Sequence, residues 1–321
     1  MKIQTCSLLM LCLLIVCSAG PVPQVLAEEY RVGTWKTPQT IQPFFYDRYL
    51  REGSGISVFP FTNPADQKTA LLAGSLDMCG TTITHAIHSA SRGEPVVIVA
   101  ALCNKCSALV VQRQGDIHAV TDLRDRKIGY VPGTMHEVLL RETLARGGLS
   151  PEGDVDLVRV DFFDMGLALA HGNIDAFLSG EPFPTRAVVE EYGRILSYPY
   201  FGETIGTINA GMLVLSDSIT GHRHRVEELV AAHVEATVYL TSHPGAWLDR
   251  ASHFGTPKAI LERAAPNMEL AWQMDDSFVR KTAALGRRMK DLGMIEREPD
   301  YAALIDLSFV RQIREARQDR Q

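Results

Sequence analysis

Short hydrophobic runs and amphipathic stretches alternate along the chain from Tyr30 onward. The β-rich runs predict strands, and apolar positions spaced three or four residues apart predict helices. Such alternation is typical of an α/β fold, in which crossover helices join parallel strands. The predicted strands are 30–33, 78–82, 96–102, 108–112, 127–131, 157–160 and 211–215, with one more near residue 58. The predicted helices are 40–52, 66–72, 83–92, 135–147, 164–170, 184–192, 224–242, 258–265 and 276–292.

The same series of elements occurs twice. One series starts at Arg31-Val32-Gly33 and contains Gly74-Ser75-Leu76-Asp77, and the other starts at Lys127-Ile128-Gly129 and contains Gly172-Asn173-Ile174-Asp175. Each glycine can adopt the left-handed conformation that ends a helix, and we expect each aspartate to accept hydrogen bonds from turn amides. The duplication predicts two Rossmann-like lobes with a cleft between them, followed by a helical C-terminal part.

The first 27 residues have the pattern of a signal peptide. Lys2 supplies a basic start, residues 7–19 are apolar, and Val25-Leu26-Ala27 is a small-residue cleavage site. The apolar run is too short to span a bilayer. Val16 fits poorly before a lipid-modified cysteine, so we do not expect an anchor at Cys17. These features predict export to the periplasm.

Composition narrows the function. The 321 residues are 46% hydrophobic and carry a net charge of -6, without a cluster of basic and aromatic residues. A nucleic-acid partner is therefore not expected. The sequence lacks Gly-x-Ser-x-Gly, Walker, His-Glu-x-x-His and Gly-x-Gly-x-x-Gly motifs. We accordingly predict no enzymatic activity and no cofactor.

Several motifs, in this order, resemble the periplasmic substrate-binding proteins of ABC importers, in the nitrate, sulfonate and taurine branch that includes binders of pyrimidine precursors. The resemblance extends from Tyr30 to about Val310. It implies the type II periplasmic-binding-protein fold, with a hinge and an interlobe cleft, and a monomer that delivers a small solute to ABC permease subunits. The motifs are 31–35, 70–77, 92–99, 120–129, 172–176, 181–183 and 291–295.

The family fold crosses between its lobes twice, which places the crossings near Val110–Asp116 and Thr207–Leu215. The resulting domains are a signal peptide at 1–27, the first part of lobe 1 at 28–112, and lobe 2 at 113–209. Residues 210–321 then return to lobe 1 and form the C-terminal helices.

Ligands of open α/β sheets bind where strands end and helices begin, because helix N-termini offer free amides and partial positive charge. Each candidate also has an ordinary structural interpretation, such as a surface loop, a helix cap or a solvated histidine. The candidate ligand-binding residues are Trp35, Thr37, Thr81, Thr82, His85, Asn104, Thr134, His136, Glu181 and Asn209.

Three cysteines remain after removal of the signal peptide: Cys79, Cys103 and Cys106. One hypothesis is a disulfide, either Cys103–Cys106 or Cys79–Cys103. A second is a metal or metal-complex site formed by Cys79, Cys106 and His85, whose soft ligands suit zinc or copper. A third is a thiol that contacts a soft or reducible solute.

The leading hypothesis is an extracytoplasmic solute-binding component of an ABC importer, which captures a small solute by hinge closure. The candidate hydroxyl and amide groups favour a small organic or sulfur-containing anion, although Glu181 argues mildly against it. The alternatives are a periplasmic metal-binding protein that uses Cys79, Cys103 and Cys106, and an exported small-molecule lyase on the same fold.

Overall fold

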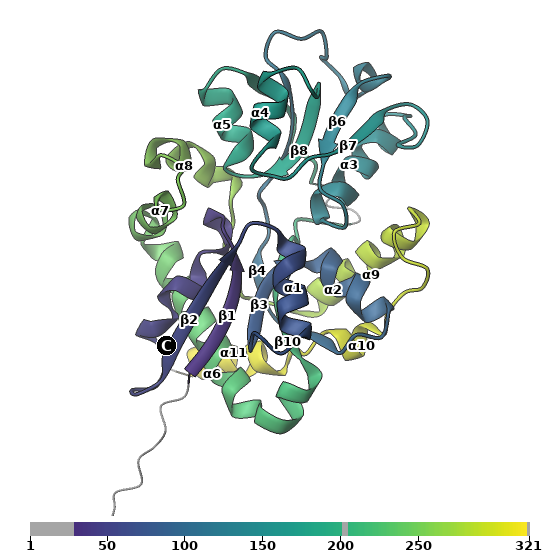
Figure 1. Ribbon diagram of the computed structural model, residues 1–321. Coiled ribbons are helices and arrows are strands. Elements are labelled where there is room, and N and C mark those ends of the chain that lie inside the picture. The colour runs from purple at the N-terminus through teal and green to yellow at the C-terminus, as the bar shows by residue number, and fades with distance from the viewer. Residues whose placement is uncertain (1–28, 201–204, 320–321) are drawn as a thin grey trace, which may run out of the picture.

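The structure, a computed structural model, describes residues 29–200 and 205–319. The predicted signal peptide, with Cys17, lies outside the described residues. In the part of the chain that is described, no helix combines the length and hydrophobicity needed to cross a membrane. Figure 1 shows two lobes, one above the other, each built around its own sheet.

The first sheet has the strand order β2-β1-β3-β10-β4. Strands β1, β2 and β3 are parallel, whereas β10 lies antiparallel between β3 and β4. All residues of the central strand β3 and of the edge strand β4 are buried, as expected for hydrophobic strands covered by helices on both faces. The strands are β1 (Glu29–Trp35), β2 (Gly55–Phe61), β3 (Met78–Thr82), β4 (Val96–Cys103) and β10 (Ala210–Leu215).

The second sheet repeats this arrangement in the order β7-β6-β8-β5-β9. Its first three strands are parallel, and β5 lies antiparallel between β8 and β9. The matching topology confirms the predicted two-lobed α/β fold. The strands are β5 (Ser107–Gln112), β6 (Lys127–Tyr130), β7 (Asp156–Arg159), β8 (Ala176–Gly180) and β9 (Gly193–Ser197).

The repeated Gly-x-(Leu/Ile)-Asp segments have the same structure in both lobes. Gly74 and Gly172 both have φ of 71°, in the left-handed region. Asp77 Oδ2 accepts from the backbone amide of Arg31 at 2.8 Å, and Asp175 Oδ2 accepts from that of Lys127 at 2.8 Å. The aspartates therefore accept backbone hydrogen bonds as predicted, but their donors belong to neighbouring strands and not to the turns.

The first crossing between the lobes lies earlier than predicted. Strand β4 ends at Cys103 in the first sheet, and β5 begins at Ser107 in the second. The crossing therefore occupies residues 104–106, so the expected crossing at Val110–Asp116 and the lobe boundary at residue 112 were wrong. The error arose because β5 directly follows β4 in sequence but pairs with β8 and β9. The chain re-enters the first sheet at Ala210.

Helices cover both sheets, and the predicted helix at 40–52 was wrong. Two 3₁₀ turns, Pro38–Thr40 and Gln42–Arg48, occupy this region, where Pro43 removes a backbone donor. Strand β9 and helices α7, α10 and α11 were not predicted. The helices are α1 (Pro64–Leu72), α2 (Ile83–Ser91), α3 (Met135–Arg146), α4 (Met165–Ala170), α5 (Phe183–Val189), α6 (Ser216–Ser242), α7 (Pro244–Ser252), α8 (Lys258–Ala264), α9 (Asp276–Asp291), α10 (Tyr301–Leu304) and α11 (Ser308–Gln318).

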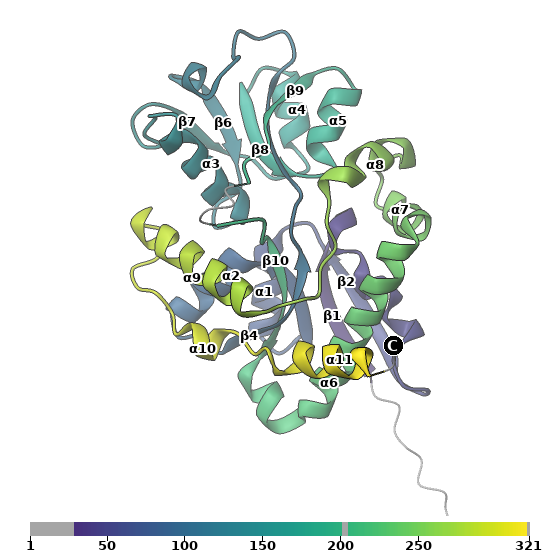
Figure 2. The same ribbon diagram turned by 180° about the vertical axis from the view of Figure 1, so that it is seen from behind.

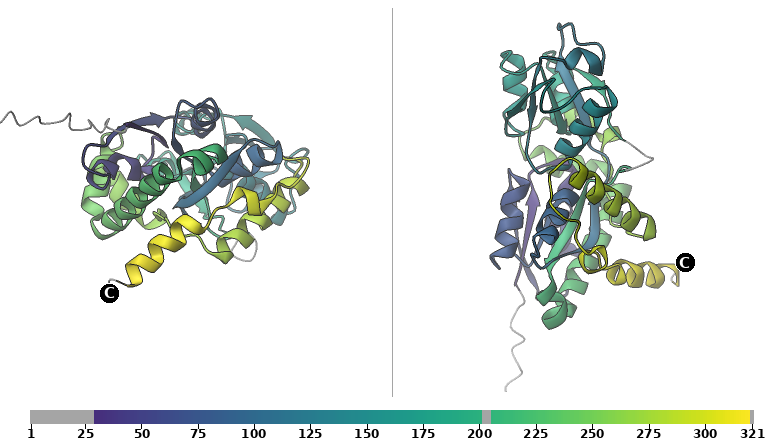
Figure 3. Two further views of the ribbon diagram at one scale, coloured as in Figure 1. Left: turned by 90° about the horizontal axis from the view of Figure 1, so that it is seen from below. Right: turned by 90° about the vertical axis from the view of Figure 1, so that its right-hand side faces the viewer.

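The C-terminal helices are associated mainly with the first lobe. Helix α6 packs along its sheet, and α11 packs on α6 and β4 (Figure 2). Helix α8 instead reaches the second lobe, where it contacts α5. Figure 3 shows α11 on the first lobe, away from the second. The C-terminal part therefore both completes the first lobe and supports the second.

The second sheet has hydrophobic packing on both faces. Leu109 and Val111 of β5 belong to the large hydrophobic cluster shared with α3, whereas Val110 belongs to a smaller cluster with residues of α4 and α5. This division follows the alternation of side chains along a strand. Trp35, from the first lobe, also belongs to the smaller cluster, so the core of the second lobe includes a side chain from the first.

Candidate functional site

The two lobes meet where Trp35, the last residue of β1, packs against the second lobe. Its ring centroid lies 4.8 Å from that of Phe162 and 6.2 Å from that of His136. The indole Nε1 donates to the backbone oxygen of Thr62 at 3.1 Å, and only 3% of the residue is exposed. Trp35 therefore contributes an aromatic surface to the contact between the lobes. We call this contact the interlobe seam: Trp35, Thr84 and His85 from the first lobe, with Gly133, His136 and Phe162 from the second.

The start of α2 forms a second part of the seam. Thr82, the residue before α2, shares a 2.8 Å hydrogen bond between its Oγ1 and that of Thr84. Thr84 Oγ1 also donates to the backbone oxygen of Gly133 in the second lobe, at 2.8 Å. The predicted residue Thr82 thus supports a hydrogen bond between the lobes, which Thr84 makes.

His85 also lies at this contact, and Thr81 holds it. Thr81 Oγ1 donates to the backbone oxygen of Pro64 at 2.9 Å and lies 3.1 Å from His85 Nδ1. A Cβ atom on Gly133, which has φ of 76°, would lie 3.3 Å from His85 Nε2. Burial, with the nearby charge of Lys68, lowers the pKa of His85 to about 3. The imidazole is therefore neutral at pH 7 where it faces the second lobe.

His136, in the first turn of α3, is the polar group of the seam that lacks a partner. Its Nδ1 lies 3.0 Å from Ser107 Oγ, while its Nε2 has no hydrogen-bond partner within the described residues. Burial lowers its pKa to about 3. A Cβ atom on Gly180 would lie 3.1 Å from Nε2 and 3.3 Å from Cys106 Sγ, so the absent side chain leaves both atoms facing the end of β8.

Thr37 and Thr134 are occupied by local structure. Thr134 Oγ1 donates to the oxygen of Val131 at 2.8 Å and accepts from the amide of Glu137 at 3.4 Å, which makes it the cap of α3. Thr37 Oγ1 lies 3.1 Å from Thr40 Oγ1. Both are buried. For these two candidates, the structural interpretation accounts for the hydroxyl contacts.

Glu181 is a fully buried carboxylate directly after β8. Oε1 accepts from Asn267 Nδ2 at 3.1 Å, and Oε2 accepts from the amide of Thr185 at 3.1 Å. Burial raises the pKa of Glu181, and these two donors partly oppose the shift. Tyr200 extends the network, because its hydroxyl accepts from the amide of Ser107 and donates to Asn267 Oδ1, both at 2.7 Å.

Asn209 lies at the return crossing, directly before β10. Its Nδ2 donates to Cys106 Sγ at 3.3 Å, and its backbone oxygen accepts from Ile83, the first residue of α2. The residue is buried. Asn209 therefore connects both crossings between the lobes to the helix that starts at the seam.

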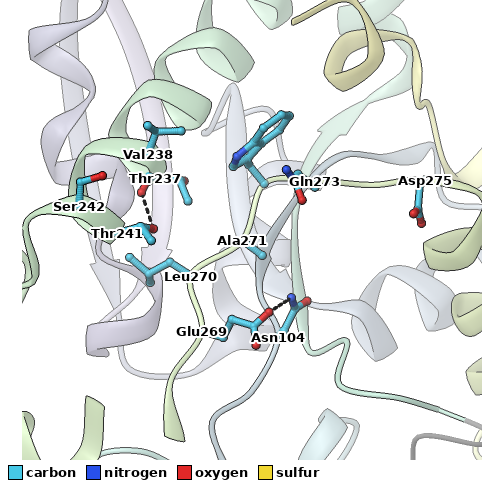
Figure 4. Close-up of a pocket in the computed structure, with 11 residues that line it drawn as sticks. Asn104, Thr237, Val238, Thr241, Ser242, Glu269, Leu270, Ala271, Gln273 and Asp275 are labelled. Atoms are coloured by element: carbon cyan, nitrogen blue, oxygen red, sulfur yellow. Dashed lines mark hydrogen bonds between the residues drawn. The ribbon is translucent and has the colours of Figure 1, made fainter. Parts of the chain in front are cut away.

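Asn104 lies in a different pocket. Its Nδ2 donates to Glu269 Oε1 at 2.7 Å, as Figure 4 shows. This pocket, of about 400 Å³, lies between the end of α6 and residues 269–275, and no other predicted site residue lines it. The structure thus separates Asn104 from the residues of the seam.

The cysteine hypotheses have different outcomes. Cys79, Cys103 and Cys106 are all buried and free in this structure. Cys79 and Cys103 lie on strands separated by β10, too far apart for the expected disulfide between them. Within the described ranges, no three His, Cys, Asp or Glu side chains gather as a metal site. The expected metal group of Cys79, Cys106 and His85 was therefore wrong.

Two buried glutamines were missed. The side-chain amides of Gln39 and Gln67 have no partner in the part of the chain that the structure describes, and both residues are completely buried. Gln39 lies two residues after the predicted site residue Thr37, and this position could have marked it as a candidate. Gln67 lies in α1, where nothing in its helical pattern distinguished it. Both are unsatisfied groups of the kind that a ligand or water can pair.

A further interlobe contact lies between α3 and α9. Arg288 Nε, on α9, lies 2.6 Å from Glu142 Oε2, on α3. Arg146 Nε on α3 lies 2.7 Å from the other carboxylate oxygen of Glu142. Helix α9 packs on α2 of the first lobe, so the Glu142–Arg288 ion pair connects the lobes.

The chain matches the NMT1-like family over residues 42–250. It is 29% identical over 128 residues to 4-amino-5-hydroxymethyl-2-methylpyrimidine phosphate synthase of Schizosaccharomyces pombe, a match that covers 40% of this chain and 36% of that protein. It is 28% identical over 213 residues to a Brucella abortus protein named as a binding protein, covering 64% of each. The matched part therefore spans less than two thirds of these relatives.

Solved structures show the same fold at low sequence identity. The alkanesulfonate-binding protein SsuA of Xanthomonas axonopodis pv. citri, bound to MOPS, has a TM-score of 0.78 and 19% identity, covering 88% of this chain and 100% of that one. The periplasmic nitrate-binding protein NrtA of Synechocystis has a TM-score of 0.73 and 16% identity, covering 90% and 89%. These likenesses confirm the predicted periplasmic-binding-protein fold.

Proposed function

Because the chain belongs to the NMT1-like family, we propose that it is the extracytoplasmic solute-binding component of an ABC importer. It captures a small organic solute between its lobes and presents the closed form to permease subunits. It acts in the periplasm as a monomer, without a cofactor and without catalysis. The sulfonate- and nitrate-binding proteins of the same fold support this proposal over an exported lyase, although the S. pombe relative is named as a synthase.

The observation that carries the proposal is the buried Nε2 of His136, which has no hydrogen-bond partner among residues 29–200 and 205–319. An unsatisfied buried polar atom costs roughly 1–3 kcal/mol, so groups of this kind normally have a partner. His136 lies beside Trp35 and Phe162, which offer aromatic surfaces to the same region. A solute with one polar group toward His136 and an apolar body toward these rings would satisfy both.

Closure follows from contacts that exist only when the lobes approach. The packing of Trp35 on Phe162 and the hydrogen bond from Thr84 to Gly133 both join the two lobes. A solute that contacts both lobes adds differential binding energy to this state and shifts the population toward it. The permease would then distinguish loaded from empty protein by its closed shape.

For the solute, we propose a small anion, with a sulfonate as the leading candidate. Helices α2 and α3 both begin at the seam, so their free amides and partial positive charge can face an anionic group. Glu181 favours a second candidate, an uncharged heterocycle whose N–H donates to the carboxylate. The name of the S. pombe relative, which concerns an aminopyrimidine, fits this second candidate.

The test is solute binding by purified protein that starts at residue 28. We would unfold and refold it to remove any co-purified molecule, then measure thermal stabilisation and calorimetric affinity with alkanesulfonates, nitrate and aminopyrimidines. We expect binding to one class, and we expect His136→Asn to weaken it about tenfold or more. The exposed His253→Asn is the matched control and should bind like the wild type.

Binding of no member of the panel, together with no co-purified small molecule in native mass spectrometry, would refute the proposal. Binding that His136→Asn leaves unchanged would place the solute away from the seam. A catalysed change of a bound compound would instead support the enzymatic alternative.

A further inference from the structure

Cys103 and Cys106 bracket the first crossing between the lobes. Cys103 is the last residue of β4, in the sheet of the first lobe, and Cys106 directly precedes β5, in the sheet of the second. Only Asn104 and Lys105 separate them. A covalent change that joins the two sulfurs would therefore act directly on the hinge.

The two thiols interact with each other and with the return crossing. Ala210, at the return crossing, pairs with Cys103, and the neighbouring Cys106 thiol together with burial raises the pKa of Cys103. Asn209, at the return crossing, donates to Cys106 Sγ at 3.3 Å. Both connections between the lobes thus meet at Cys106, and both cysteines are buried.

The backbone of residues 103–105 is bonded to the segment that contains Glu269 and Leu270. Asn104 donates its amide to the oxygen of Glu269 at 2.9 Å, and the oxygen of Lys105 accepts from the amide of Glu269 at 3.3 Å. Cys103 pairs with Leu270 in an isolated β-bridge. The segment beside Glu269 therefore fixes the hinge backbone next to the thiols.

We propose that Cys103 and Cys106 form a reversible disulfide site that couples the redox state of the hinge to lobe closure. Cys79 cannot replace Cys106 as the partner of Cys103, because β10 separates Cys79 from Cys103. This site does not depend on the identity of the solute. Its coupling to solute binding does rest on the proposed function.

The reaction is thiol–disulfide exchange with a protein disulfide or glutathione disulfide. One cysteine thiolate attacks a sulfur of that disulfide, which gives a mixed disulfide and releases one thiolate. The second cysteine then attacks the mixed disulfide and releases the other thiolate. The pair loses two electrons and two protons, and the external disulfide is reduced to two thiols. Because both cysteines are buried with the lobes together, we expect exchange to proceed through the open form.

The disulfide would change closure because it changes the contacts at Cys106. A disulfide holds its sulfurs about 2.05 Å apart, closer than two thiols in contact. Forming it would move Cys106 Sγ relative to Asn209, which donates to it in this structure. We therefore expect the oxidised form to close less readily and to bind solute more weakly. Reciprocally, bound solute should oppose oxidation by the same factor.

The first test needs no solute. Wild-type protein from residue 28 is equilibrated with glutathione disulfide, then denatured, alkylated and weighed intact. We expect a protein about 2 Da lighter before alkylation, with Cys79 as the alkylated thiol and a Cys103–Cys106 peptide after digestion. Cys79→Ala should still form the disulfide, whereas Cys103→Ser and Cys106→Ser should each stop at a glutathione adduct or stay reduced. Three alkylatable thiols in the wild type after equilibration would overturn the proposal.

The second test measures coupling with the solute found in the binding panel. We expect oxidation to weaken affinity by about threefold or more in the wild type and in Cys79→Ala, and the solute to slow oxidation. The Cys103→Ser/Cys106→Ser double variant should show the same affinity in both redox buffers. Equal affinity of the oxidised and reduced wild type would overturn the coupling. A disulfide that forms when no solute binds would refute the proposed function alone, whereas solute binding without a disulfide would refute this inference alone.

Discussion

The two lobes share their strand topology and differ in how they are completed. Both sheets have three parallel strands followed by an antiparallel strand and an edge strand, and both use an aspartate to hold a strand amide. The first lobe is surrounded by C-terminal helices, whereas the smaller cluster of the second lobe includes Trp35 from the first. The comparison indicates that duplication preserved the scaffold and that the strand ends facing the seam diverged.

That divergence is visible where equivalent strands end. Strand β1 ends with Trp35, whereas its counterpart β6 is followed by Val131 and the turn that leads into α3. Strand β3 ends with Thr82, whereas its counterpart β8 is followed by the buried Glu181. The corresponding strand ends of the two lobes therefore carry different side chains.

The largest expected effect comes from removing Trp35, the tryptophan that the first lobe contributes to the second. We expect Trp35→Ala to lower the free energy of unfolding by about 3–5 kcal/mol, because it empties a packed site in the second lobe's cluster. Trp247→Ala is the matched control, since Trp247 is similarly buried but donates to Pro38 within the first lobe. Hydrogen exchange after each change should show lost protection in α4 for Trp35→Ala and in α7 for Trp247→Ala. Unchanged protection of α4 in Trp35→Ala would contradict the dependence of the second lobe on the first.

Acid titration should reveal buried histidines in both lobes. Burial lowers the pKa of His136 to about 3 and that of His233 to about 4. Below about pH 6.5 the unfolded chain gains a proton that the folded protein does not, so each histidine should reduce stability by about 1.4 kcal/mol per pH unit. The free energy of unfolding is therefore not reduced by these histidines above pH 6.5, and it falls as the pH is lowered from 6.5 toward 4.

Urea unfolding between pH 7.5 and 4.5 measures this slope. We expect His136→Gln in the second lobe and His233→Gln in the first to flatten it to a similar degree. Glu181 has the opposite sign, because its raised pKa lets the folded protein take up a proton before the unfolded chain does. Glu181→Gln should therefore steepen the acid loss, and an unchanged slope in all three variants would contradict the buried states assigned here.

Asp77 and Asp175 occupy equivalent positions in the two lobes, and each accepts a hydrogen bond from a strand amide. Asp77→Ala and Asp175→Ala should each lower the free energy of unfolding by about 1–2 kcal/mol, because each leaves a strand amide without its acceptor. Asp77 also pairs with Arg31 at 3.0 Å, so its removal should cost slightly more. The difference between the two variants is measured from their midpoints of urea unfolding, provided that the dependence of the unfolding free energy on urea concentration is the same for both. If only one of the two substitutions lowered the free energy of unfolding, the two aspartate–amide hydrogen bonds would not be equivalent.

The smallest effect concerns the Glu142–Arg288 ion pair between α3 and α9. Arg288→Ala should favour the open form by about 0.5 kcal/mol, less at high salt. Small-angle scattering of solute-free protein should then show a larger radius of gyration at low salt. Arg146→Ala changes the same carboxylate from within the second lobe and should leave the radius unchanged. An equal expansion in both variants would rule out a specific link across the lobes.

The sequence predicted those parts of the fold that local chemistry determines. Gly74 and Gly172 have the same role in short segments, so their repetition was readable without long-range information. The donors to the aspartates that follow them lie on distant strands and were not predicted. The strand Ser107–Gln112 was also recognisable, but its sheet was not, because pairing with β8 depends on residues far along the chain. The proline-containing segment near Pro43 gave a helical pattern that its backbone does not follow.

The candidate site was predictable in outline but not in its contacts. Trp35, His85 and His136 follow strand ends or helix starts, which indicates their common location. The side chain of Asn104 pairs with Glu269, a partner that no local pattern specifies. Gln39 and Gln67 escaped notice because neutral amides carry no sequence signal of burial.

The position of β10 between β3 and β4 has a consequence for how the chain acquires its structure. Strands β3 and β4 of the first sheet, at residues 78–82 and 96–103, acquire their shared neighbour only when residues 210–215 arrive. During synthesis, which starts at the N-terminus, the facing edges of β3 and β4 therefore stay unpaired while more than a hundred further residues are added. Such non-local pairing slows folding and leaves aggregation-prone edges available to chaperones. For the exported protein that we propose, the same delay would keep the sheet open while the chain passes through a narrow export channel.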